Sequence, residues 1–72
     1  MSTAFGSAVR RLRNKKSISI NKLAVLAGMQ TTYLGDIERG NRNPALANML
    51  KIAKALDVPL SKLIQEMENE AA

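Results

Sequence analysis

The sequence predicts an all-α fold of five short helices. Apolar residues recur at the three- and four-residue spacing of amphipathic helices along most of the chain. The residues between these runs are mainly Gly, Pro, Asn and Ser, which favour turns, and no stretch alternates in the manner of a strand. We expect one domain over residues 1–72, with helices at about 4–16, 20–27, 31–39, 45–56 and 60–69.

The first expected helix carries its apolar residues on one face and its charges on the others. The apolar residues are Phe5, Ala8, Val9 and Leu12. Arginine and lysine occupy the remaining faces and the C-terminal end, where positive charge complements the helix dipole. After a short link that contains serine, Ser19 is the expected N-cap of the second helix.

The second and third expected helices lie in the stretch INKLAVLAGMQTTYLGDIER, residues 20–39. Gly28 is placed to end the second helix, because the residue after a helix often has a positive φ, which costs glycine little. Met29 gives the turn an apolar side chain to bury, and Gln30 is a candidate N-cap of the third helix. Two helices joined by a turn of three or four residues form a helix-turn-helix unit.

Two prolines mark the beginnings of the last two helices. The loop GNRNP, residues 40–44, has turn composition, and Pro44 keeps the residue before it out of helical conformation. Pro59 suits the first turn of the fifth helix. Each of these helices has an apolar stripe. The stripes consist of Leu46, Met49, Leu50, Ala53 and Leu56, and of Leu60, Leu63, Ile64 and Met67.

The net charge of +5 is unevenly placed along the chain. Residues 1–42 contain eight Lys and Arg against two acidic residues, which gives +6, whereas residues 43–72 contain three against four, which gives −1. A basic first half favours a polyanionic partner, although a solvated basic surface without a partner has the same composition. The only aromatic residues are Phe5 and Tyr33, which argues against the stacking platforms that bind single strands.

The residue types that are absent exclude several kinds of site. Histidine and cysteine do not occur, so a disulfide framework, a thiolate nucleophile and the usual zinc ligands are excluded. The few carboxylates are not clustered, and we therefore expect neither an enzyme nor a cofactor or metal site. No apolar run approaches the ~20 residues that cross a bilayer, and the N-terminus lacks a signal-peptide pattern. We expect a soluble cytoplasmic protein without a membrane partner.

The chain resembles the Cro/C1-type (XRE) helix-turn-helix family of phage and bacterial regulators over about residues 5–64. The segments that carry the resemblance are VRRLRNKK (9–16), LAVLAG (23–28), IERGNRNP (37–44) and MLKIAKALDVPLSKLI (49–64). The run TTYLGDIERGNRNP is also similar to the controller proteins of restriction–modification systems. The resemblance implies a lambda-repressor-like fold, double-stranded DNA as the partner and a role in transcription regulation.

The sequence departs from this family at three positions. Ile20 occurs where the family usually has a Gln that contacts phosphate, and Asn21 is the nearest polar replacement. Ala45 stands where a Ser or Thr usually caps the fourth helix. Gly35 lies in the middle of the recognition helix, where it costs roughly 1 kcal/mol relative to Ala and allows close approach to DNA.

The third helix supplies the candidates for base contacts. Leu34 and Ile37 are expected in the core, and the outward-facing residues are then Gln30, Thr31, Thr32, Gly35, Asp36 and Arg39. The base-contact candidates are Gln30, Thr31, Thr32 and Asp36. Gln pairs with adenine, a Thr methyl packs on the thymine methyl, and a carboxylate accepts from cytosine. The alternatives are a simple N-cap for Gln30 and an ion pair of Asp36 with Arg39 or Lys22.

Phosphate contacts are expected on both sides of the reading helix. The loop after it offers short polar side chains and an arginine, and the N-terminus of the second helix offers free N–H groups and the positive end of a dipole. The candidates are Asn21, Lys22, Tyr33, Arg39, Asn41, Arg42 and Asn43. For Tyr33, partial burial in the core is the alternative.

The resemblance also implies a structural ion pair between Arg13 and Glu38, because the family pairs these two positions. One such domain contacts one half-site, so we expect a homodimer that packs through the fourth and fifth helices. The interface candidates are Ile52, Leu60, Ile64 and Met67, for which simple core burial is the alternative.

Two function classes follow from these features. The first is a sequence-specific regulator that binds an inverted-repeat operator as a homodimer, with RNA polymerase or another protein as a further candidate partner. The second is an antitoxin or interaction module that uses the same fold to bind a protein, for which the acidic and apolar stretch 63–70 is suited.

Overall fold

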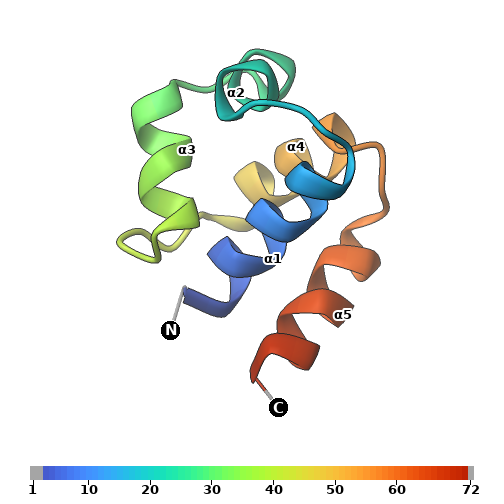
Figure 1. Cartoon of the computed structure of the whole chain (residues 1–72). Helices are drawn as coiled ribbons and strands as arrows, with labels where there is room; N and C mark the ends of the chain where they lie inside the picture. The colour runs from blue at the N-terminus through green and yellow to red at the C-terminus, as the bar shows by residue number, and fades with distance from the viewer. Residues whose placement is uncertain (1–2, 72) are drawn as a thin grey trace.

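The computed structural model describes residues 3–71 and confirms the predicted all-α fold. Its helices, shown in Figure 1, are α1 (Thr3–Lys15), α2 (Ile20–Ala27), α3 (Thr31–Glu38), α4 (Leu46–Ala55) and α5 (Leu60–Ala71). No strand occurs in this range. The predicted helix ends differ from the observed ones by at most two residues, and residues 1, 2 and 72 of the expected domain lie outside the described part.

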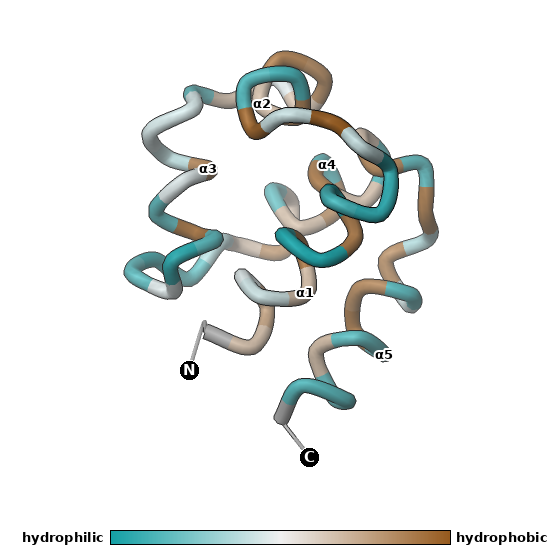
Figure 2. Tube along the Cα trace, viewed as in Figure 1, coloured by the Kyte–Doolittle hydropathy of each residue, from teal (hydrophilic) through white to brown (hydrophobic). Residues whose placement is uncertain are grey.

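The helices are arranged so that α3 lies at one edge of the molecule. α1 packs against both α5 and α3, whereas α2 packs against α3 and α4. Figure 1 shows α5 running beside α1, with α3 on the opposite side of α1. Figure 2 shows that the residues of the loop after α3 and of the last turns of α5 are mainly hydrophilic. The outer side of α3 is therefore left uncovered by the other helices.

One cluster of apolar side chains forms the core, and all five helices contribute to it. Its members are Phe5, Ala8, Val9, Leu12, Leu23, Ala24, Leu34, Ile37, Ile52, Ala53, Leu56 and Leu63. Burying one large aliphatic or aromatic side chain contributes roughly 1.5–3 kcal/mol. The residues that the apolar periodicity predicted for the first and third helices are all in this cluster, so the pattern identified the inner faces of these two helices correctly.

Helix α2 has both of its predicted caps, whereas α3 lacks its predicted one. Ser19 Oγ accepts a hydrogen bond from the Lys22 backbone N–H at 3.0 Å. Gly28 has φ 69°, the left-handed conformation expected of it, and Met29 is half-buried against the core. Gln30 occupies the N-cap position of α3, but its side chain makes no cap hydrogen bond. The prediction that Gln30 caps α3 with its side chain is therefore wrong.

Gly6 permits a close approach of α1 to the C-terminal end of α3. A Cβ at this position would overlap the carbonyl oxygen of Ile37 and would lie 2.8 Å from that of Glu38. Both obstacles are backbone atoms, so no side-chain rotation relieves the overlap. The contact brings α1 close enough to α3 for its arginines to reach Glu38.

Within residues 3–71 no helix is long and apolar enough to cross a membrane.

Candidate nucleic-acid interface

The first turn of α3 is open to solvent on its outer side. Leu34 and Ile37 are fully buried, as predicted, and fix the orientation of the helix about its axis. Gln30, Thr31 and Thr32 are exposed. Because Gln30 is not engaged as a cap, its amide is free to turn toward a ligand. This turn presents an amide, two hydroxyls and two methyl groups on a helix end of a width that fits a DNA groove.

The second half of α3 differs from the prediction in the exposure of Gly35. This glycine lies on the outer side of the helix, as predicted, but it is buried, because the guanidinium of Arg39 lies over it. Arg39 Nη2 is 2.6 Å from Asp36 Oδ1. The alternative prediction for Asp36, an ion pair with Arg39, is therefore confirmed.

Tyr33 connects α3 to the loop after it and to α4. The ring is half-buried against the core, which confirms the alternative prediction of partial burial. The guanidinium carbon of Arg42 lies 5.1 Å from the ring centroid, a cation–π contact. Asn48 Nδ2 donates to the Tyr33 hydroxyl at 2.9 Å. Because the hydroxyl acts as the acceptor in this bond, its own proton is free to be donated to another group.

Asn48 is a site residue that the sequence reasoning missed. It lies in the first turn of α4, just after the loop to which phosphate contacts were assigned. A polar residue in the first turn of a helix, directly after such a loop, was the available signal. The N-cap of α4 is Ala45, which provides no side-chain cap.

The loop and the beginning of α2 supply further exposed polar groups. Asn41, Arg42 and Asn43 are exposed, and the Asn41 backbone N–H donates to the Asp36 carbonyl at 2.9 Å, which fixes the start of the loop. Asn21 and Lys22 are also exposed, in the first turn of α2. Ile20 packs against the core and offers no polar group at this end of α2.

Glu38 forms the predicted ion pair with Arg13. Arg13 Nε lies 2.8 Å from Glu38 Oε2, and Arg13 Nη2 lies 3.1 Å from Oε1, so the pairing is bidentate. The Glu38 side chain is 1% exposed. The hydrogen bond to this carboxylate raises the pKa of the Arg13 guanidinium. Arg13 Nη1 also donates to the Ile18 carbonyl, and Arg10 adds an unpredicted third cationic contact at 3.5 Å.

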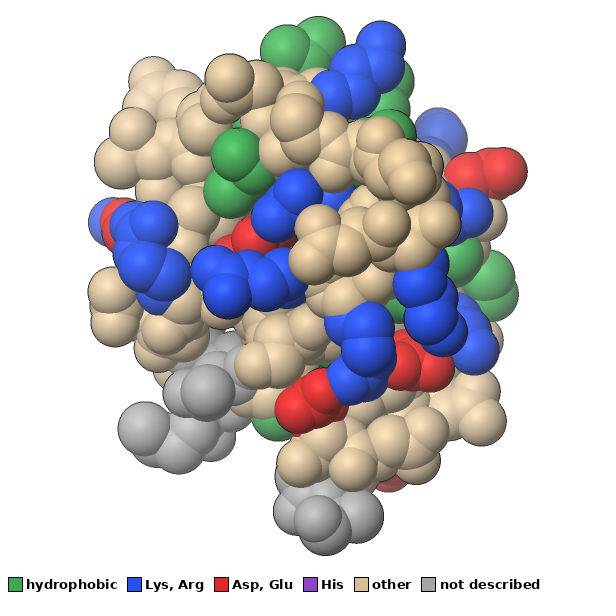
Figure 3. Space-filling model, viewed as in Figure 1, with side chains coloured by type: hydrophobic (Ala, Val, Ile, Leu, Met, Phe, Trp, Pro, Cys, Tyr) green, Lys and Arg blue, Asp and Glu red, His purple; other side chains and the backbone are tan. Residues whose placement is uncertain are grey.

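A second group of ion pairs joins α1 to α5. Arg11 contacts Glu66 at 2.6 Å and also pairs with Glu70, while Lys62 lies 3.4 Å from Glu66. The hydrogen bond from Arg11 lowers the pKa of the Glu66 carboxyl. Figure 3 shows the consequence on this face, where red carboxylates lie between the blue basic side chains. The acidic end of α5 thus neutralises part of the basic surface of α1.

The residues predicted for a dimer interface fall into two groups. Ile52 is completely buried within its own chain. The prediction that Ile52 lies in a dimer interface is therefore wrong. Leu60, Ile64 and Met67 are half-buried. The sequence reasoning also missed exposed apolar surface on α4, where Leu46 and Leu50 are 62% and 50% exposed.

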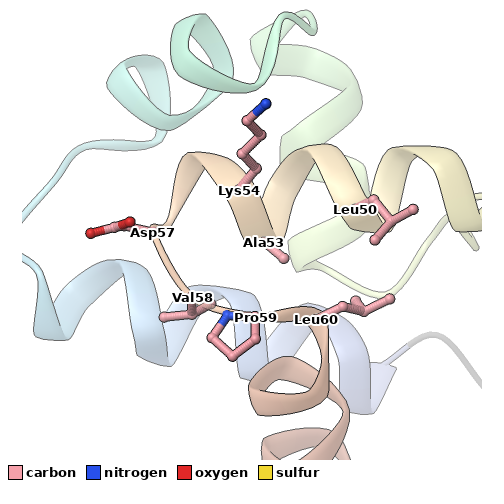
Figure 4. A pocket seen from close by; sticks show the side chains of 7 residues that line it. All are labelled: Leu50, Ala53, Lys54, Asp57, Val58, Pro59 and Leu60. Atoms are coloured by element: carbon pink, nitrogen blue, oxygen red, sulfur yellow. The ribbon is translucent and has the colours of Figure 1, made fainter.

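Leu50 and Leu60 border a groove of about 480 Å³ between α4 and α5. It is lined by Leu50, Ala53, Lys54, Asp57, Val58, Pro59 and Leu60. Figure 4 shows Leu50 of α4 and Leu60 of α5 on the same side of the groove, with Ala53 and Pro59 between the two helices. The described residues contain no group of three or more acidic side chains arranged to hold a metal ion.

Residues 9–63 match the family model HTH_3, whose description is helix-turn-helix. The chain is 46% identical to the control protein C.BamHI of Bacillus amyloliquefaciens over 61 residues, which cover 83% of this chain and 75% of the relative. It is 39% identical to the control protein C.SmaI of Serratia marcescens over 64 residues, which cover 86% of this chain and 76% of the relative.

The solved structures include a similar protein with the same helix arrangement. The high-resolution crystal structure of the restriction-modification controller protein C.AhdI from Aeromonas hydrophila superposes with a TM-score of 0.84. The two sequences are 44% identical, and the match covers 86% of this chain and 94% of that chain.

Proposed function

Because this chain belongs to the helix-turn-helix family HTH_3, we propose that it is a DNA-binding transcriptional regulator of the restriction–modification controller type. The observation that carries the proposal is α3, whose inner face is fully buried and whose first turn presents Gln30, Thr31 and Thr32 to solvent. The relatives named above are control proteins, which favours this function over the alternative of an antitoxin or protein-binding module.

In this proposal, α3 enters the major groove of double-stranded DNA with its first turn deepest. Gln30 reaches an adenine through its amide, while Thr31 and Thr32 offer methyl groups to thymine and hydroxyls to base edges. These three side chains are supported by Leu34 and Ile37, which are fully buried. A rigid helix behind short side chains keeps the reading atoms in a fixed position.

Phosphates are bound on either side of this turn. Arg42 is held against the Tyr33 ring, and within the described chain it has no carboxylate partner. The Tyr33 hydroxyl, aligned by Asn48, donates its proton to a phosphate oxygen next to Arg42. On the other side, Asn21 and Lys22 act with the free N–H groups at the start of α2.

The regulator acts as a two-fold dimer that covers two half-sites about 10 bp apart. Its interface lies along the groove between α4 and α5, which is bordered by the exposed Leu50 and the half-buried Leu60, and Leu46 on α4 adds a further exposed apolar side chain. Ile64 and Met67 on α5 extend this surface. A second copy that seats its own α4 in the groove removes the largest exposed apolar residues of α4 from water.

Selection of bound sequences from random duplexes tests the reading assignment. We expect an inverted repeat, with an affinity that falls steeply as salt rises. Thr31→Ala should change the preferred sequence, whereas Arg42→Ala should weaken binding to all duplexes alike and reduce the salt slope by about one. Failure to enrich any sequence, or equal binding of all duplexes, would refute the proposal.

Sedimentation analysis tests the dimer. We expect a dimer at micromolar concentration and a monomer for Leu50→Lys, which places a charge in the groove. Val25→Lys is the matched control, because Val25 is an exposed apolar residue of α2 that lies outside the groove. A wild-type chain that stays monomeric with and without DNA would contradict this part of the proposal.

A further inference from the structure

The last turn of α3 holds an arrangement that the proposed function has not used. Arg39 is on the outer side of the helix, and its side chain folds back toward the helix N-terminus over Gly35. A Cβ at Gly35 would lie 3.1 Å from Arg39 Nη1 and 3.5 Å from Nη2. The absence of a side chain at Gly35 therefore makes room for the guanidinium to lie against the helix backbone.

Asp36 fixes the guanidinium in this position. Its Oδ1 accepts from Arg39 Nη2 at 2.6 Å, and the side chains of Asp36 and Arg39 are 29% and 55% exposed. Arginine carries five N–H donors, and the bond to Asp36 is the only side-chain hydrogen bond of Arg39 within the described chain. The other donors, on Nε, on Nη1 and the second on Nη2, have no partner within the described chain. The hydrogen bond to Asp36 thus holds the Arg39 guanidinium in one orientation, while most of its donors are available to a ligand.

The charge of the pair distinguishes two possible ligands. A phosphate contact depends on net positive charge, and the Asp36 carboxylate both offsets the charge of Arg39 and repels phosphate oxygens. The major-groove edge of guanine is neutral and offers two acceptors, O6 and N7, that match two arginine donors.

We infer that Arg39 reads guanine in each half-site, with Asp36 as its positioning residue and Gly35 as the space that receives the guanidinium. The inference rests on the proposed function and revises two predicted roles, since Arg39 was a phosphate candidate and Asp36 a direct base candidate. The inference adds a second group that contacts bases. This group is the Arg39 guanidinium, which lies over Gly35, one turn after Thr31 and Thr32. Arg42, which has no carboxylate partner, keeps the phosphate role.

Competition binding on the selected operator and its single-base variants tests the inference. For the wild type, we expect one G·C position in each half-site at which substitution lowers affinity roughly 5- to 150-fold, the range for one bidentate contact. Arg39→Ala should abolish this preference and leave the salt slope unchanged. Arg42→Ala is the control, because a phosphate contact lowers affinity for all variants alike and reduces the slope by about one.

Asp36→Asn separates positioning from a merely structural role. It should reduce the guanine preference while raising affinity for unrelated duplexes, because a repulsive charge is removed. Gly35→Ala should reduce the preference more weakly by displacing the guanidinium. An Arg39→Ala variant that keeps the guanine preference, or that behaves like Arg42→Ala, overturns the inference but leaves the proposed function intact. A wild type that enriches no sequence overturns both.

Discussion

Two buried glycines occupy the two sides of α3 and differ in what surrounds them. Gly6 on α1 faces the inner side, where the nearest atoms are backbone oxygens of Ile37 and Glu38. Gly35 faces the outer side, where the nearest atoms belong to the end of the Arg39 side chain. A backbone atom moves only with its helix, whereas a guanidinium moves by rotation of its own side chain. The inner contact therefore determines the placement of α3, while the outer one determines a detail of its surface.

The largest effect is expected for Gly6→Ala. The added methyl group overlaps two backbone oxygens of another helix, so the cost should exceed the usual overpacking penalty of about 1–3 kcal/mol. A chain of this size has a total stability of roughly 4–11 kcal/mol, and we expect most of it to be lost. Denaturant unfolding followed by circular dichroism measures the loss. Equal stability of the Gly6→Ala and Gly35→Ala variants would contradict the comparison, since both make the same chemical change.

A smaller loss is expected for Glu38→Ala, which removes the carboxylate from the inner side of α3. Arg13 would keep its charge in a mostly buried position, with only the Ile18 carbonyl left as a partner. Removing one partner of a buried pair costs about 3 kcal/mol or more. Thermal melting of Glu38→Ala beside Asp36→Ala, which breaks an exposed pair, provides the measurement and its control. Similar melting temperatures for the two variants would show that burial of the Glu38 pair adds nothing.

A modest pH effect is expected from the surface pair between α1 and α5. The folded-state pKa of Glu66 lies below its ordinary value of 4.5, chiefly because Arg11 donates to the carboxylate. The stability from this pair is therefore fully present above pH 4.5 and is lost as the pH falls through the depressed value. Melting temperatures of the wild type and Glu66→Gln should differ at neutral pH and converge in acid. Glu68→Gln is the control, and a difference that does not change with pH would refute the assignment.

The smallest effect is expected for Gly35→Ala. Alanine favours a helix interior over glycine by roughly 1 kcal/mol, and a displaced Arg39 side chain offsets part of this gain. We expect the free energy of unfolding to stay within about 1 kcal/mol of the wild type. Denaturant unfolding measures it. A loss as large as that for Glu38→Ala would mean that the outer side of α3 is as rigidly packed as the inner side.

The features that the sequence predicted are those that neighbouring residues determine. Gly28 and Ser19 act within one turn of the helix that each bounds, and the buried spacing of Leu34 and Ile37 orients the first turn of α3. The pair of Arg13 and Glu38 is distant along the chain, but the family resemblance supplied it. These predictions needed no knowledge of how the helices cross.

The features that the sequence did not predict depend on which helices meet. Gly6 is informative only once α1 is known to cross the end of α3. The bond from Asn48 to Tyr33 joins residues of two helices across a loop. On α4, the sequence shows which residues are apolar, but not which of two apolar edges the other helices cover. In the structure the other helices bury Ile52 and leave Leu50 exposed to solvent.

Tyr33 also makes the proposed interface directly observable. The chain contains one tyrosine and no tryptophan, so its tyrosine emission comes from a single ring. That ring touches Arg42 and accepts a hydrogen bond from Asn48, at the place where we propose a phosphate binds. A change in this emission on titration with duplex DNA reports occupancy of the site without any attached dye. The same signal followed after rapid mixing gives the association rate from the unmodified protein.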